Sequence, residues 1–159
     1  MPCEIENGIV KRYLPCVEEQ EVETADGFVH MRVTEIGVKV PEGVRRIGAY
    51  AFCDCRVLQR VLLPEGVEEI SPYAFYGCFG LREITLPSTV KRIGKNAFAE
   101  CANLRSVILP RDLQEIGFSA FAGCYRLSEV QGDFYDRMAP EKRRLVFERC
   151  PVIRAGEKK

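Results

Sequence analysis

A period of 23 residues runs through the middle of this chain and constrains its fold more than any other feature. Proline recurs at Pro41, Pro64, Pro87 and Pro110. The four units that begin at these prolines align without a gap: 41–63, 64–86, 87–109 and 110–132. A fixed period of this length is typical of a solenoid, in which each coil buries its apolar side chains against its neighbours.

Apolar residues recur in the same columns of every unit. The columns are Val44/Val67/Val90/Leu113, Ile47/Ile70/Ile93/Ile116, Phe52/Phe75/Phe98/Phe121, Cys55/Cys78/Cys101/Cys124, Leu58/Leu81/Leu104/Leu127 and Val61/Ile84/Val107/Val130. Apolar and polar residues alternate toward the end of each unit, which predicts a short strand with one side in the core. We expect these strands to pair in parallel, to end at each proline, and to leave the four phenylalanines stacked in the core.

The unit pattern Cys-x-x-Leu-x-x-Ile-x-Leu-Pro-x-x-Val-x-x-Ile-Gly-x-x-Ala-Phe resembles the BspA-type (Treponema pallidum-type) leucine-rich repeats over residues 41–132. The chain departs from it at Ser71, which replaces glycine, and at Gln131-Gly132. The resemblance implies a leucine-rich-repeat solenoid with a parallel β-sheet of about five strands on its concave face and an irregular convex side. It also implies a protein-interaction module, similar to bacterial surface adhesins of this family.

The chain is expected to form a single domain over residues 1–159. Ile36 to Val40 precede the first proline in the same register, so the repeat region begins at 36 and ends at 132. Residues 1–35 predict a β-rich N-terminal cap, with short strands around turns at Asn7-Gly8 and Asp26-Gly27.

The remaining residues, 133–159, predict a C-terminal helical cap and tail. The expected helix runs from Tyr135 to Arg149, with Pro140 near its start. Met138, Leu145 and Val146 are expected on its buried side, near Phe134 and Phe147. Five glycines of the repeats are expected in turns with positive φ: Gly43, Gly48, Gly66, Gly94 and Gly117.

Charged residues alternate in sign from unit to unit just before the Ile-Gly step. The pairs are Arg45-Arg46, Glu68-Glu69, Lys91-Arg92 and Gln114-Glu115. Stacked coils would place opposite charges side by side, which favours a structural role in fixing the register; contact with a partner is the alternative.

Four of the eight cysteines occupy one repeat column, and we expect them to be small, buried and reduced. Disulfide bonding or zinc binding is the alternative, but a row of thiols lacks the converging geometry of a zinc site. The only close pair is Cys53 and Cys55, and Cys3, Cys16 and Cys150 lie off the repeat.

No pattern in the sequence points to catalysis. His30 is the single histidine, and no phosphate-binding, dinucleotide, zinc-protease or EF-hand motif occurs. We therefore expect neither an enzyme nor a bound cofactor or metal.

The best candidate for function is the outward row of the predicted strands, which varies from unit to unit while the core columns do not. Its residues are Lys39, Arg60, Leu62, Glu83, Thr85, Ser106, Ile108, Glu129 and Gln131. Leu62 and Ile108 are apolar at positions that should meet water, which favours a protein partner. The alternatives are a structural spacer or fragment of a larger repeat protein without a partner, and carbohydrate binding, which the lack of aromatic residues in this row disfavours.

Charge and hydropathy limit the other partners. Lys and Arg total 23, as do Asp and Glu, so no basic surplus favours nucleic acid, and no apolar run is long enough to cross a membrane. We expect a monomer. The lack of a signal peptide and the number of thiols favour the cytoplasm for the chain as given, whereas a place in a longer product would favour the cell surface.

Overall fold

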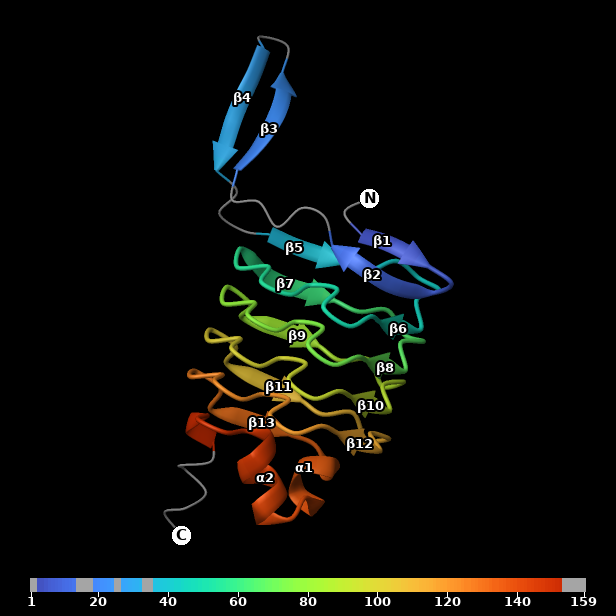
Figure 1. Ribbon diagram of the computed structural model, residues 1–159, viewed down its shortest axis with the longest axis vertical. Helices are drawn as coiled ribbons and strands as arrows, with labels where there is room; N and C mark the ends of the chain where they lie inside the picture. Colours follow the sequence, from blue (N-terminus) through green and yellow to red (C-terminus); the bar gives the residue numbers. More distant parts are fainter. Residues whose placement is uncertain (1–2, 14–18, 25–26, 33–35, 153–159) are drawn as a thin grey trace.

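The structure is a computed structural model and describes residues 3–13, 19–24, 27–32 and 36–152. Its central part is a stack of coils that runs from the N-terminal end near the top of Figure 1 to the C-terminal end at the bottom, and successive coils add parallel strands on two sides of the stack. One side, called the first sheet below, carries the strands predicted from the alternating pattern: β5 (Ile36–Lys39), β7 (Leu58–Leu62), β9 (Glu83–Thr85), β11 (Ser106–Ile108) and β13 (Glu129–Gln131). They form two hydrogen-bonded groups, β5-β7-β9 and β11-β13. Within each group the strands pair in parallel and in the predicted register, which confirms the leucine-rich-repeat solenoid.

A second sheet occupies the side that the sequence analysis treats as irregular. It is built from two-residue strands at the Ile-Gly step: β6 (Arg46–Ile47), β8 (Glu69–Ile70), β10 (Arg92–Ile93) and β12 (Glu115–Ile116). Two residues are too few to show an alternating pattern, so the sequence did not reveal these strands. The sheet keeps each isoleucine buried and each preceding charged residue on the outside.

The N-terminal cap extends this second sheet. Strands β1 (Cys3–Glu6) and β2 (Ile9–Tyr13) form a hairpin whose turn, Asn7-Gly8, has positive φ at both residues, as predicted. Strand β2 pairs in parallel with β6, so that Val10 lies beside Ile47 in the core. The hairpin of β3 (Glu19–Thr24) and β4 (Gly27–Arg32) lies beyond this end of the stack (Figure 1). Asp26, part of the second predicted turn, lies outside the described residues.

The core is a row of stacked side chains that runs along the solenoid. The phenylalanine columns stack as predicted, with ring centroids 4.7 Å apart for Phe52 and Phe75, 5.1 Å for Phe75 and Phe98, and 5.0 Å for Phe98 and Phe121. All four rings are fully buried. Since each ring has a neighbour in the next coil, no coil can bury its phenylalanine alone.

The single C-terminal helix predicted from Tyr135 to Arg149 is wrong. The segment forms two short helices, α1 (Asp133–Arg137) and α2 (Pro140–Val146), with Met138 and Ala139 extended between them. Pro140 forces the residue before it out of the helical conformation, so the helix stops there and a new one begins with proline in its first turn. Met138 and Val146 are buried as predicted, but Leu145 is exposed.

The repeat glycines play two different roles. Gly43 and Gly66 have positive φ, as predicted, whereas Gly48, Gly94 and Gly117 do not. At Gly94, an added Cβ would lie 2.4 Å from the backbone nitrogen of Pro72 in the preceding coil. Glycine in this column therefore permits close approach of neighbouring coils rather than a left-handed turn.

Candidate protein-binding surfaces

The nine residues predicted to bind a partner all lie exposed on the outer face of the first sheet. Strand register within each group, and the 23-residue repeat between β9 and β11, align them in two rows across the strands. One row contains Arg60, Glu83, Ser106 and Glu129, and the other contains Lys39, Leu62, Thr85, Ile108 and Gln131. The face thus brings together residues from five coils, although their distance along the chain reaches 92 residues.

Two members of the second row are large apolar side chains that meet solvent. Leu62 is 47% exposed and Ile108 is 65% exposed, with Thr85 of β9 between them. The adjacent coils lie about 4.8 Å apart. An extended segment crossing the strands could therefore contact both side chains.

Some of the polar side chains on this face already bond to each other. Arg60 Nε donates a hydrogen bond to a Glu83 carboxylate oxygen at 3.1 Å, between neighbouring coils. Gln131 donates to the Glu129 carboxylate on the same strand. Both pairs are exposed, so a partner could displace them at little cost.

A polar pocket of about 240 Å³ opens at the edge of the face, and its arginines were missed by the sequence analysis. It is lined by Gly37, Gln59, Arg60, Arg82, Glu83, Arg105 and Ser106. Arg82 and Arg105 occupy one repeat column just before β9 and β11. Two basic residues at the same position of adjacent coils could therefore have indicated this basic site from the sequence.

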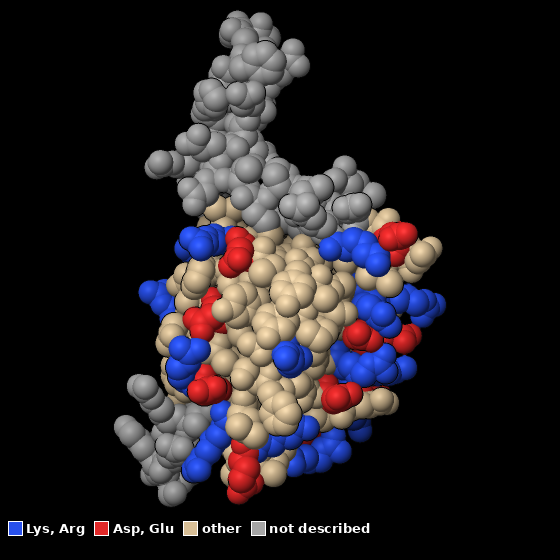
Figure 2. Space-filling model, viewed as in Figure 1, with Lys and Arg blue, Asp and Glu red and all other residues tan. Residues whose placement is uncertain are grey.

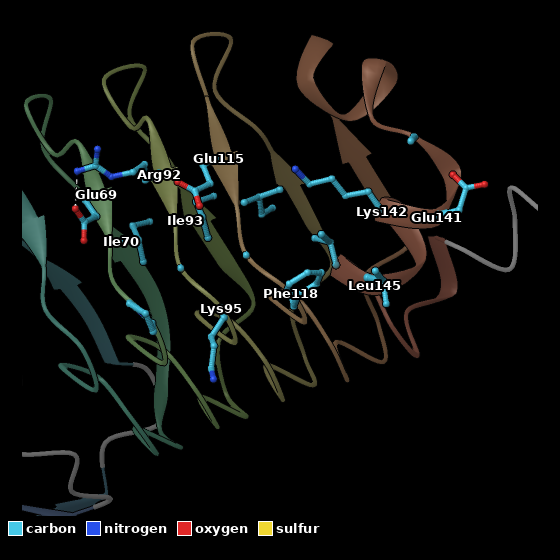
Figure 3. A pocket seen from close by; sticks show the side chains of 16 residues that line it. Glu69, Ile70, Arg92, Ile93, Lys95, Glu115, Phe118, Glu141, Lys142 and Leu145 are labelled. Carbon is cyan, nitrogen blue, oxygen red and sulfur yellow. Dashed lines mark hydrogen bonds and ion pairs between the residues drawn. The ribbon is translucent and has the colours of Figure 1, made fainter.

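A second, larger groove of about 810 Å³ lies between the second sheet and α2, and its existence was not predicted (Figure 3). Ile70, Ile93 and Ile116 contribute to its floor, where Gly94 and Gly117 carry no side chain. Phe118 and Leu145 are exposed apolar residues in its lining. The groove depends on how α2 docks against the coils, which the repeat pattern does not reveal.

Charged residues border this groove and form the predicted charge ladder, the column of alternating sign on the second sheet. Arg45 pairs with Glu68 at 3.2 Å, and Glu69 pairs with Arg46 at 3.4 Å and with Arg92 at 2.8 Å. The predicted pairing of opposite charges is confirmed for these coils. Burial alone would raise the pKa of the Glu69 carboxyl, but the hydrogen bond from Arg92 and the charge of Arg46 outweigh burial and lower this pKa.

Buried cysteines form a row of thiols that hydrogen-bond from coil to coil. Each Sγ donates to the carbonyl oxygen of a phenylalanine one coil back: Cys78 to Phe52 at 3.0 Å, Cys101 to Phe75 at 3.2 Å, Cys124 to Phe98 at 3.2 Å and Cys150 to Phe121 at 3.0 Å. Cys150 therefore continues the row in space, although it lies off the 23-residue repeat in the sequence. Burial raises the pKa of the Cys101 and Cys124 thiols, which keeps them protonated.

Two further cysteines differ from this pattern. Cys55 is disulfide-bonded, so the prediction of a reduced thiol is wrong at this position. Cys53 is free and half-buried. Burial first, and then the neighbouring Asp54 carboxylate, raises the pKa of the Cys53 thiol to about 11.

Within the described part of the chain, no group of three or more His, Cys, Asp or Glu side chains could hold a metal ion. His30 lies on β4, opposite Glu21 of β3, and its side chain lies outside the described residues. Over the same described ranges, no helix is both long and apolar enough to cross a membrane.

Charged residues of the coils gather along the edges of the face seen in Figure 2. Uncharged side chains form a broad area between them, in the region between the two columns of strands. Exposed aromatic residues of the repeats include Tyr50, Phe79, Phe118 and Tyr125. Tyr50 stacks on Tyr73 of the next coil at 5.1 Å, so part of its ring surface is already covered.

Comparison with known protein families agrees with this repeat architecture. The profile for the BspA type leucine rich repeat region matches residues 26–140 in six copies. A comparison with curated protein sequences gives no match.

Three solved structures are similar in fold and sequence. The leucine-rich-repeat protein of T. pallidum has 29% identity and a TM-score of 0.58, with 79% of this chain and 75% of that chain covered. The pneumococcal vaccine antigen PcpA has 25% identity and a TM-score of 0.59, with 69% and 30% covered. A leucine-rich-repeat protein of Bacteroides ovatus has 28% identity and a TM-score of 0.56, with 78% and 36% covered. The chain thus spans less than a third of the pneumococcal antigen.

Proposed function

Because the chain belongs to the BspA-type leucine-rich-repeat family, we propose that it is a non-catalytic scaffold that binds a protein on the outer face of the first sheet. The exposed Leu62 and Ile108 carry this proposal, since both present apolar surface to water on a face held rigid by the stacked core. A preformed face loses little conformational entropy when it binds, which favours affinity.

The residues around these two side chains suit a protein partner. Arg60, Glu83 and Glu129 supply charges at the border of the apolar row, and Thr85 and Ser106 supply hydroxyl groups. An apolar centre with a polar border is the usual composition of a protein interface. We extend the proposal to an adhesin-like bacterial role, supported by the similarity to the pneumococcal vaccine antigen.

A different function, that of a structural spacer within a longer repeat protein, would need no partner. The chain spans only 30% of the pneumococcal antigen, which favours this alternative. The groove lined by Phe118 and Leu145 offers a second place where a protein could bind. One experiment separates the three possibilities.

The experiment compares the full chain with two variants as immobilised baits for proteins of the source organism and of the cells it contacts. The face variant changes Arg60, Leu62, Glu83 and Ile108 to Ser. The groove variant changes Phe118 and Leu145 to Ser. All six side chains are at least partly exposed, so circular dichroism should show unchanged folding in both.

We expect at least one protein to be retained by the full chain and the groove variant, and about tenfold less by the face variant, as quantitative mass spectrometry would show. Loss in the groove variant alone would move the binding site to the groove. Equal retention by all three baits would contradict binding on either surface, and no retention would favour the spacer.

A further inference from the structure

Two arginines of the polar pocket break the rule of alternating charge that the second sheet follows. On the second sheet, Glu69 lies between Arg46 and Arg92 and pairs with both. Near the first sheet, Arg82 is followed one coil later by Arg105 in the same column. Like charges in the same column of neighbouring coils repel each other. The fold therefore gains nothing from this arrangement.

Nothing within the described residues neutralises these two groups. The pocket contains three guanidinium groups and a single carboxylate, that of Glu83, which is already bound to Arg60 at 3.1 Å. Arg82 and Arg105 are both exposed, and neither side chain has a hydrogen bond or an ion pair with a described residue. Two adjacent guanidinium groups without a partner form a site for an anion, because each can donate paired hydrogen bonds to a carboxylate.

The shape of the pocket follows from Gly37 on β5. Its position faces solvent, and a Cβ placed there would meet nothing within 4 Å. The missing side chain leaves the pocket open above Arg60, with a volume of about 240 Å³. This space admits a whole acidic side chain rather than only a small ion.

We propose that this pocket binds a carboxylate side chain of the protein partner, and that the partner segment combines acidic with apolar residues. This inference rests on the proposed function. Ser106 lines the pocket and Ile108 lies two residues further along the same strand, on the same face and therefore about 7 Å away. A segment with an acidic residue in the pocket would place a neighbouring side chain on Ile108. A sulfated polysaccharide would satisfy the arginines but not the apolar row, so the geometry favours a peptide.

The test uses the full chain and three probes. The first is a short peptide that alternates glutamate and leucine, with both ends blocked. The second is its glutamine counterpart, and the third is a heparin oligosaccharide. Binding is followed by nuclear magnetic resonance through the side-chain Nε–Hε signals of Arg82 and Arg105 and the methyl signals of Ile108, at low and at physiological salt.

Three variants accompany the wild type. The pocket variant carries Arg82→Gln and Arg105→Gln. The charge control carries Arg111→Gln and Lys142→Gln, which remove the same charge from exposed positions outside the pocket. The row variant carries Leu62→Ser and Ile108→Ser, which test the proposed function separately.

We expect the acidic peptide to shift the signals of both arginines and of Ile108. The pocket variant and the glutamine peptide should each weaken binding by about tenfold or more, and the charge control by less than about twofold. Four outcomes would each overturn the inference. The charge control could lose as much binding as the pocket variant, or the glutamine peptide could bind as well as the acidic one. Heparin could be the only probe that binds, or the wild type could bind none of the probes. Loss in the row variant but not in the pocket variant would overturn the pocket while supporting the face. Unchanged binding in both variants would contradict the pocket and the face together.

Discussion

Phe147 stacks on Phe121, with ring centroids 5.3 Å apart and the ring planes inclined by 12°. It thereby adds a fifth ring to the phenylalanine row, although it belongs to the C-terminal cap. The hydrogen bond from the Cys150 thiol to the Phe121 carbonyl oxygen spans 29 residues, three more than the 26 of the equivalent hydrogen bonds in the repeats. The cap is therefore a modified coil in which α1 and α2 lengthen the connection before Phe147.

Close packing at Gly94 predicts a large effect for a small substitution. Gly94→Ala should lower the free energy of unfolding by about 1–3 kcal/mol, because the new methyl group would collide with the backbone of Pro72. Gly37→Ala is the matched control, since nothing lies within 4 Å of a Cβ there. Chemical denaturation of both variants measures the difference, and an equal loss in the two would contradict the packing argument.

The charge ladder predicts a stability contribution that depends on pH. The folded state lowers the pKa of Glu69 from its ordinary value of 4.5, so the carboxylate stabilises the fold above that value and loses its contribution as the pH falls through the folded pKa. Glu69→Gln should therefore cost about 1 kcal/mol at neutral pH and progressively less below pH 4.5. Denaturation curves of wild type and variant across this pH range measure the gap.

Glu115→Gln serves as the control for this effect, because Glu115 occupies the same column and is exposed. Its substitution should change stability by less than about 0.5 kcal/mol at any of these pH values. High salt should also reduce the effect of Glu69→Gln. The stability difference between wild type and Glu69→Gln should shrink on acidification. If it grew instead, Arg46 and Arg92 would not stabilise the carboxylate.

The row of thiols predicts slow chemical modification. Cys101 is fully buried, its Sγ donates to Phe75, and its raised pKa leaves almost no thiolate to react. A maleimide or iodoacetamide reagent should label Cys101 only when the coil opens, so the labelling rate should follow denaturant concentration. Peptide mass spectrometry after timed labelling provides the measurement. Rapid labelling in native conditions would contradict the buried, hydrogen-bonded thiol.

Residues inside the repeats could be predicted because the period fixes their environment. Phe98 has a phenylalanine one unit before it and another one unit after it, so its stacking follows from position alone. Leu145 has no such constraint. Its predicted burial assumed one continuous helix, and the break at Pro140 changes the direction of every later side chain. Cys150 and Phe147 were missed because the three additional residues shift them out of the period.

The candidate surfaces, too, could be predicted only where a repeating pattern fixes the direction of the side chain. Alternation on the strands correctly placed Leu62 and Ile108 outward, because the period of a strand is two residues. Arg82 and Arg105 stand just outside the strands, where alternation says nothing about direction. The groove beside Phe118 requires the docking position of α2, which depends on contacts between residues distant in sequence rather than on local pattern.

The stacking of Phe147 predicts that the cap protects the last coil. Phe147→Ala should lower the free energy of unfolding by about 3–5 kcal/mol, since it removes a fully buried ring and leaves a cavity beside Phe121. Phe118→Ala, at a position 68% exposed, should cost less than about 1 kcal/mol. Hydrogen exchange should show the added opening in Phe147→Ala spreading from the C-terminal end, because each coil is stabilised mainly by its neighbours. Opening that began instead at the N-terminal coils would show that the cap does not control the stability of the last coil.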